Sequence, residues 1–229
     1  MRVASFNICH GTRGEGTALD LPALVMACRS FDADVIALEE VDRFADGRSG
    51  PNQAKVVADA LGLAWAWAPS RTRDRVTSGV ALLVRGRIAG VEPIALRGHR
   101  RIGHRRDHRG ALIALVDVAE QPFTVSVCHL SQDRQDSLAQ QRLVLDALVA
   151  RPGPHVFLGD LNRRTPWVKP EMDRHGLVLA TDDVKSAPRT HPHFRIDHLA
   201  VGGLAIEAVR IVDAGTSDHR ALVADLGVP

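Results

Sequence analysis

The sequence predicts an α/β fold in which two mixed β-sheets pack face to face and helices cover their outer faces. Apolar, β-branched runs alternate with helical patterns toward both ends of the chain, which favours parallel strand–helix–strand units. Strand candidates follow one another directly between residues 79 and 129, which favours antiparallel pairing. The 229 residues contain no repeat and no low-complexity linker, so we expect a single domain over residues 1–229.

The N-terminal part is predicted to alternate strand and helix. Arg2–Asn7 is the first strand candidate, and Leu21–Ser30 is predicted to be a helix that begins after Asp20 as its N-cap. Residues 34–38 are predicted to form a short buried strand. A polar loop containing glycine then leads to a helix near Gln53–Leu61.

The middle and C-terminal parts supply most of the strands. Five consecutive strand candidates cover residues 64–68, 79–84, 88–96, 111–118 and 123–129. A longer helix fits residues 136–149, where Leu138, Leu145 and Leu148 form much of an apolar face and charged residues lie opposite. Four further strands are expected at residues 155–158, 196–201, 205–212 and 221–226.

The composition is that of an ordinary globular protein and identifies no partner. Hydrophobic residues make up 45% and charged residues 24% of the chain, and the net charge of +2 is too small to argue for nucleic acid. No apolar run reaches the roughly 20 residues that a membrane helix needs, and the N-terminus leads into a strand candidate rather than a signal peptide. Cys9, Cys28 and Cys128 are widely spaced and odd in number, which indicates reduced thiols. We therefore expect a cytoplasmic monomer without a transmembrane segment.

Six short polar segments recur along the chain, most of them directly after a buried strand candidate. They are Ser5-Phe6-Asn7, Leu38-Glu39-Glu40-Val41-Asp42, Cys128-His129-Leu130, Gly159-Asp160-Leu161-Asn162, Arg195-Ile196-Asp197-His198 and Ser217-Asp218-His219-Arg220. Because side chains leave the sheet at strand ends, these segments can converge at one rim. Carboxylates, amides and histidines gathered at one rim are the groups that a phosphoester hydrolase with a hard metal ion needs.

The same segments resemble those of the endonuclease/exonuclease/phosphatase superfamily, the DNase I-like hydrolases. The resemblance runs from position 6 to position 219, and it includes Gly79-Val80-Ala81-Leu82-Leu83 in addition to the polar segments. It implies a four-layer α/β sandwich, which agrees with the fold predicted above. It also implies hydrolysis of phosphate esters with Mg²⁺ or Mn²⁺ as cofactor.

The chemistry of the donor groups makes Glu40 the best metal ligand. Mg²⁺ prefers one or two carboxylates together with water and substrate oxygens. Glu39 and Glu40 alternate along a strand, so only one of them should face the site. The superfamily usually has glutamine before the metal-binding glutamate, which assigns the ligand to Glu40 and leaves Glu39 as a supporting or surface residue. The resemblance also implies Asp218 near the metal, and Asn7 on the phosphate or on the metal with its water shell.

The remaining catalytic candidates follow the later strands. Asp160 and Asn162 lie two residues apart, so both can project to the same side. The resemblance assigns Asp160 to orienting or deprotonating the attacking water and Asn162 to contacting the phosphate. It also implies a pair between Asp197 and His219, and an imidazole held by a carboxylate can bind or protonate phosphoryl oxygens. His129 is a candidate acid or phosphate hydrogen-bond donor.

Residues 97–109 form a basic run of six arginines and three histidines. Such a run is often only a solvated loop, but it could also form a cationic rim for nucleic acid or for an anionic lipid head group. Arg109 precedes a strand at a point where the superfamily often has an arginine near the phosphate, so it is the member expected to bind substrate. Arg71, Arg73 and Arg75 form a second basic cluster.

The predicted function is hydrolysis of a phosphodiester by in-line attack of water, with a nuclease and a phospholipid or head-group phosphodiesterase both open. A phosphomonoesterase of phosphoinositides or small phosphate esters is the alternative. Residues 190–197 lack the aromatic segment that inositol phosphatases carry before the late aspartate, which disfavours that alternative. A non-catalytic anion-binding module is a third possibility, and the retained carboxylates Glu40, Asp160, Asp197 and Asp218 argue against it.

Overall fold

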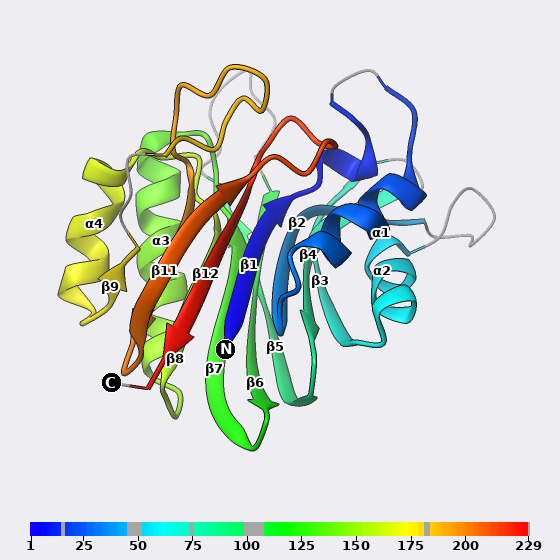
Figure 1. The fold of residues 1–229 in the computed structure, drawn as a ribbon. Helices are drawn as coiled ribbons and strands as arrows, with labels where there is room; N and C mark the ends of the chain where they lie inside the picture. The colour runs from blue at the N-terminus through cyan, green and yellow to red at the C-terminus, as the bar shows by residue number, and fades with distance from the viewer. Residues whose placement is uncertain (15–16, 45–51, 74–75, 99–107, 181–183, 229) are drawn as a thin grey trace.

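A computed structural model describes residues 1–229 except 15–16, 45–51, 74–75, 99–107, 181–183 and 229. Two mixed six-stranded sheets pack face to face (Figure 1). The first sheet has the order β11 (Ala205–Val212), β12 (Ala221–Gly227), β1 (Arg2–Asn7), β2 (Val35–Phe44), β4 (Val76–Val84) and β3 (Ala64–Arg73). The second sheet has the order β5 (Arg87–Arg97), β6 (His108–Val118), β7 (Gln121–His129), β8 (His155–Asp160), β10 (Asp197–Gly202) and β9 (Val178–Leu179).

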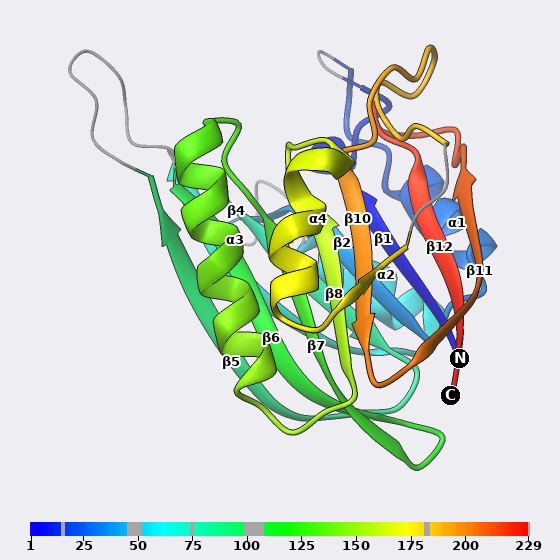
Figure 2. The ribbon, with the colours of Figure 1, turned by 90° about the vertical axis from the view of Figure 1, so that its left-hand side faces the viewer.

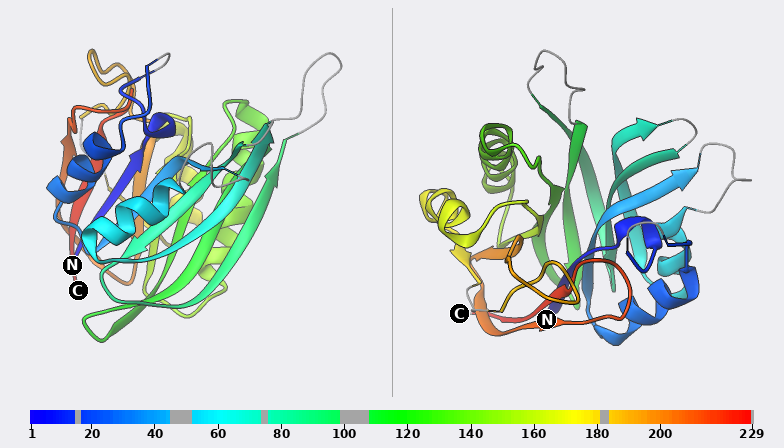
Figure 3. Two further views of the ribbon diagram at one scale, coloured as in Figure 1. Left: turned by 90° about the vertical axis from the view of Figure 1, so that its right-hand side faces the viewer. Right: turned by 90° about the horizontal axis from the view of Figure 1, so that it is seen from above.

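Helices cover the outer face of each sheet, as the end-on view in Figure 3 and the side view in Figure 2 show. The helices α1 (Leu21–Ser30) and α2 (Gln53–Leu61) pack on the first sheet, and α3 (Arg134–Val149) and α4 (Thr165–Arg174) pack on the second. The predicted four-layer α/β sandwich is therefore confirmed. Asp20 caps α1, because its carboxylate accepts a hydrogen bond from the backbone N–H of Ala23.

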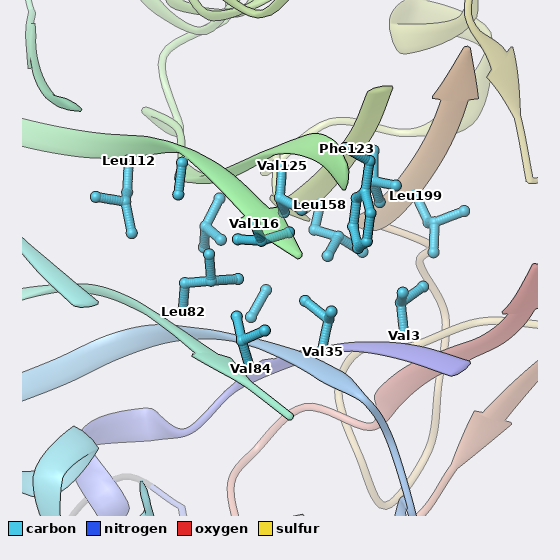
Figure 4. Close-up of a cluster of buried hydrophobic side chains, with 14 of the residues drawn as sticks. Val3, Val35, Leu82, Val84, Leu112, Val116, Phe123, Val125, Leu158 and Leu199 are labelled. Atoms are coloured by element: carbon cyan, nitrogen blue, oxygen red, sulfur yellow. The ribbon is translucent and has the colours of Figure 1, made fainter. Parts of the chain in front are cut away.

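The main core fills the space between the two sheets. Val35 and Leu82 of the first sheet face Val116, Phe123 and Leu158 of the second sheet, and these side chains are buried (Figure 4). Every second residue of a strand points into this layer, so the inner faces form a continuous apolar series. This series continues up to the strand ends that carry the polar segments.

Strand pairing determines which polar segments become neighbours. β1 pairs with β12 in antiparallel and with β2 in parallel orientation, so the first and last parts of the chain lie side by side. In the second sheet, β8 pairs with β7 in parallel and with β10 in antiparallel orientation. The chain termini lie at the opposite end of the sandwich from the end of β1, as Figure 1 shows.

The structure differs from the predicted elements at several points, and the short strand β9 and a 3-10 helix at Cys9–Gly11 are among the elements that were not predicted. Several strands are longer than predicted, most clearly β2, which continues past residue 38 to Phe44. The helix α4 was not predicted, because Pro166 and Pro170 are poor helix residues. Pro166 is tolerated in the first turn, and the burial of Val168 and Met172 stabilises the rest of the helix. Residues 99–107 of the basic run and Arg75 lie outside the described residues.

Among the helices in the described part of the chain, none combines the length and the apolar character needed to cross a membrane.

Candidate active site

Strand alternation brings four of the predicted site residues to the inner faces of the two sheets at one end of the sandwich. They are Asn7 on β1, His129 on β7, Asp160 on β8 and Asp197 on β10. On β8, for example, the core residues Val156 and Leu158 precede Asp160 with a period of two. Asp160 is aligned with His129 across the parallel pair and with Asp197 across the antiparallel pair. The apolar layer therefore ends in a polar cluster.

Asp160 lies at the centre of this cluster and is 1% exposed. Its Oδ2 accepts a hydrogen bond from Asn7 Nδ2 at 3.0 Å and lies 3.5 Å from His129 Nε2. Its Oδ1 accepts from the backbone N–H of Asn162 at 2.9 Å. Burial, together with the negative charge of Asp197, raises the pKa of Asp160 to about 6. A carboxylate with this pKa is suited to accept a proton near neutral pH.

His219 and Asp197 form a buried pair. His219 Nδ1 lies 3.1 Å and 3.0 Å from the two carboxylate oxygens of Asp197. Burial alone would lower the pKa of His219, but the charge and hydrogen bond of Asp197 outweigh it and raise this pKa well above the usual value. The opposite nitrogen, Nε2, lies 3.9 Å from Asp160 Oδ2. The structure thus brings a cationic imidazole next to the candidate base.

The segment that carries His219 is fastened to the end of β1. Ser217 Oγ donates a hydrogen bond to the backbone carbonyl of Asn7 at 2.6 Å and accepts one from the backbone N–H of His219 at 3.1 Å. The backbone N–H of Ser217 also donates to the carbonyl of Thr12. These bonds fix the position of His219 relative to Asn7.

His129 faces donors at its Nε2 atom. Arg109 Nη1 lies 2.7 Å and Asn162 Nδ2 3.1 Å from this nitrogen, so it acts as an acceptor. Burial and the charge of Arg109 lower the pKa of His129 well below the usual value. A neutral imidazole is a poor proton donor, so the geometry favours a hydrogen-bonding role over the acid role. Arg109, Asn162 and His129 form one connected group.

A β-bulge separates the two glutamates of β2. The register with β4 shifts between Leu38 and Val41, and Glu40 has the positive backbone angle φ of 57°. Glu40 therefore leaves the regular alternation, and its side chain is 27% exposed, 3.9 Å from His129 Nε2.

Glu39 is fully buried, which excludes the surface position that the sequence left open. Its Oε1 accepts a hydrogen bond from Ser5 Oγ at 3.1 Å, and its Oε2 has no hydrogen-bond partner among the residues that the structure describes. Burial, with a contribution from the charge of Asp197, raises the pKa of Glu39 well above its usual value. Glu39 thus lies buried beneath the site, where burial disfavours its charged form.

Two sets of side chains could hold a metal ion. Asp160, Asp197 and His219 offer ligand atoms within 4.8 Å of one another, but Asp197 and His219 already bond to each other. Glu40 and Asp218 form the other set. The charges of both contribute to the raised pKa of the buried Cys9 thiol. Oxygen donors of this kind fit Mg²⁺ or Mn²⁺ better than an imidazole does.

Asn7, the third predicted ligand, is held at both ends of its amide. Its Oδ1 accepts a hydrogen bond from the backbone N–H of Cys9 at 3.0 Å, and its Nδ2 donates to Asp160. The geometry therefore favours a role for Asn7 in orienting Asp160. A metal ion could reach only the second lone pair of Oδ1.

Sequence analysis missed His10, which follows Asn7 by three residues. His10 has a positive φ of 58°, and its Nδ1 lies 3.0 Å from Asp42 Oδ1. Its Nε2 lies 3.4 Å from Glu40 Oε2. The sequence does show a histidine followed by Gly11 shortly after the first polar segment. Nothing in the strand pattern, however, indicated that this histidine would lie beside Asp42.

The model of the Endonuclease/Exonuclease/phosphatase family matches residues 4–219. No curated protein sequence matches the chain.

Solved structures show the same fold. The chain is similar to an endonuclease/exonuclease/phosphatase from Beutenbergia cavernae, with a TM-score of 0.83 and 23% identity over 99% of this chain and 71% of that chain. It is similar to the human Nocturnin catalytic domain with bound sulfate, with a TM-score of 0.75 and 16% identity over 100% of this chain and 94% of that chain. A mannosyl-6-phosphatase from Bacteroides thetaiotaomicron has a TM-score of 0.71 and 13% identity over 99% of each chain.

Proposed function

The chain belongs to the endonuclease/exonuclease/phosphatase family, and on this basis we propose that it hydrolyses phosphodiester bonds by metal-assisted attack of water. The family name covers nucleases and phosphatases, which are hydrolases of phosphate esters. The observation that supports the proposal most is the buried arrangement of Asp160 beside the His219–Asp197 pair. It combines a proton acceptor and a fixed positive charge within one cluster.

Asp160 is the proposed general base. Its pKa of about 6 leaves the carboxylate ionised at neutral pH and still basic enough to take a proton from an attacking water. The hydrogen bonds from Asn7 and from the backbone of Asn162 fix both carboxylate oxygens. The water is therefore oriented by a base that cannot rotate freely.

His219 and the His129 group are proposed to bind the phosphoryl oxygens. His219 is held in its charged form by Asp197, so its Nε2–H can donate to an oxygen that gains negative charge during attack. Asn162 and Arg109 can donate to the same phosphate from the side of His129. These donors are fixed before substrate binds, so little reorganisation is needed in the transition state.

Glu40 and Asp218 are the proposed ligands of a divalent cation, Mg²⁺ or Mn²⁺. Such an ion, when bound, would supply Lewis-acid stabilisation of negative charge on the phosphoryl oxygens. The bulge in β2 takes Glu40 out of the regular alternation of the strand, and Asp218 Oδ1 lies 3.3 Å from Ser217 Oγ. The donor set and its partial exposure fit a cation that keeps some of its water ligands.

The substrate is proposed to be a diester, either in nucleic acid or in a phospholipid or its head group. A phosphomonoesterase would use the same base and the same hydrogen-bond donors to the phosphate. The geometry of the site therefore does not distinguish a diesterase from a monoesterase. Residues 190–197 lack the segment of the inositol phosphatases, which supports the diesterase.

Nicking of supercoiled plasmid in Mg²⁺ or Mn²⁺ tests the proposal, with bis(4-nitrophenyl) phosphate and 4-nitrophenyl phosphate as small diester and monoester substrates. We expect the diester to be cleaved and the reaction to stop with EDTA or with Asp160→Asn. Asp146→Asn, which changes an exposed carboxylate on α3, is the matched control and should retain activity. Cleavage of the small diester without nicking would direct the search to lipid head groups. Activity that survives in the Asp160→Asn protein would refute the mechanism.

A further inference from the structure

A cavity of about 140 Å³ lies beside the catalytic groups, next to Glu40 and His129. Its walls also include His10, Ser70 and Arg71 together with Arg109. Protein cavities of about 150 Å³ can hold one benzene-sized molecule, so this one has room for a single phosphate group. The cavity therefore shares Glu40, Arg109 and His129 with the proposed reaction centre.

The charges around the cavity are mostly positive. Arg71 and Arg109 line it, and Glu40, which is proposed to hold a cation, is the one carboxylate among the described residues of its wall. The hydrogen bond to Asp42 raises the pKa of His10, whereas the charge of Arg71 opposes this rise. The Arg71 guanidinium thus lies near another basic group, and no ion pair joins it to a carboxylate in the described part of the chain. Basic groups gathered in this way are stabilised by an anion between them.

A hydroxyl in the cavity wall lacks a hydrogen-bond partner. Ser70 Oγ is buried, and no partner for it is found among the described residues. Ser70 is the extra residue of a bulge in β3, because Pro69 pairs with Gly79 and Arg71 pairs with Ser78. An unsatisfied buried hydroxyl is costly, and Ser70 is one of the residues that line the cavity.

His10 is fixed in place before any ligand binds. Gln53 of α2 donates from Nε2 to the His10 carbonyl at 2.7 Å and accepts at Oε1 from the backbone N–H of Asp42 at 2.8 Å. The same Asp42 holds the imidazole through Nδ1. Gln53 thus holds both His10 and Asp42 in position, and this part of the cavity wall is preorganised.

We infer that this cavity is a subsite for a second phosphate group of the substrate, carried next to the phosphate that is hydrolysed. The inference rests on the proposed function. Arg71 and Ser70 are its specificity-determining residues, since both line the cavity and neither the Arg71 guanidinium nor Ser70 Oγ has a partner among the described residues. His10 lines the same cavity beside them.

The first test compares substrates that differ by one phosphate. One pair is thymidylyl-thymidine with and without a 5′-terminal phosphate, and the other is glycerophosphoinositol with and without a ring phosphate. We expect the phosphorylated member of one pair to have a higher kcat/KM by about tenfold to a hundredfold, the usual effect of hydrogen bonds to a charged group. Arg71→Ala should abolish this preference without changing kcat/KM for the unphosphorylated member. Arg71→Lys should retain part of it.

Arg87→Ala is the matched control, because Arg87 is an exposed arginine at the start of β5 whose nearest carboxylate, that of Asp117, is 4.0 Å away. It should keep the full preference. An equal kcat/KM for both members of each hydrolysed pair would overturn the inference, and so would a preference that persists in Arg71→Ala.

Binding of inorganic pyrophosphate, measured by calorimetry, tests the subsite independently of activity. The wild-type and Arg87→Ala proteins should bind it with similar Kd, and Arg71→Ala should bind it about tenfold or more weakly. Equal binding by all three proteins would refute the subsite. If neither substrate pair is hydrolysed, this result counts against the proposed function. The calorimetry alone then tests the subsite.

Discussion

Replacing Asp160 with asparagine should abolish hydrolysis and also stabilise the folded protein at neutral pH. Folding raises the pKa of this carboxyl from 3.8 to about 6, and each pKa unit corresponds to about 1.4 kcal/mol. Ionised Asp160 therefore costs about 3 kcal/mol of folding free energy at pH 7, and solvent does not screen a side chain that is 1% exposed. Asparagine removes this cost, but its amide nitrogen would face the Asn7 Nδ2 donor, which reduces the gain.

The net gain should be about 1 to 3 kcal/mol, which raises Tm by roughly 3 to 10 °C in a chain of this size. Because the pKa is raised in the folded state, the cost of ionisation grows as pH rises from 3.8 through about 6. The advantage of Asp160→Asn should consequently be largest near pH 7.5 and nearly absent near pH 4.

Thermal unfolding followed by circular dichroism at both pH values, in EDTA, measures this difference. Activity toward bis(4-nitrophenyl) phosphate with added metal should fall on the order of a thousandfold or more. The control Asp146→Asn should change Tm little at either pH. A destabilised Asp160→Asn protein at pH 7.5, or a gain that does not depend on pH, would show that the reasoning about burial is wrong.

Four further outcomes are expected. His219→Ala should lower kcat/KM for the small diester on the order of a thousandfold, since it removes the fixed positive charge, and steady-state kinetics will measure this. Glu39→Gln should reduce the loss of Tm between pH 5 and pH 8, because burial raises the pKa of Glu39 and its ionisation destabilises the fold as pH rises. Removal of divalent metal by EDTA should stop hydrolysis, and Mg²⁺ or Mn²⁺ should restore it in the same assay. Gly79→Ala should destabilise the protein strongly in urea titrations, because a Cβ there would lie 2.1 Å from the Ala68 carbonyl oxygen.

Strand positions could be predicted well from the sequence, because the inner faces are apolar with a period of two, whereas β2 and β3 continue past their predicted ends. The same rule placed His129 and Asp160 at adjacent strand ends, and the structure has them aligned in the parallel β7–β8 pair. The pairing of Asp197 with His219 could not be derived from spacing, since His219 lies in a loop held by Ser217. That pairing was implied only by the resemblance to the family.

The features that the sequence did not predict depend on local backbone geometry or on tertiary packing. The bulge at Glu40 and the positive φ of His10 leave no clear signal in a single sequence, because both residues are unfavourable there on their own. Helix α4 was hidden by Pro170, whose cost is offset by apolar residues that become buried only after folding. Tertiary contacts decide each of these cases.

The position of β1 between β12 and β2 has a consequence for biosynthesis. Until residues 221–227 have left the ribosome, one edge of β1 has no partner strand, and the loop with His219 cannot attach to Asn7. Pairing between the two ends of a chain closes a very long loop, which is slow and leaves an apolar edge open to aggregation. Nascent chains should therefore depend on chaperones until residues 221–227 have emerged from the ribosome. Activity should appear only once β12 has paired with β1, so its appearance measures when β12 enters the sheet.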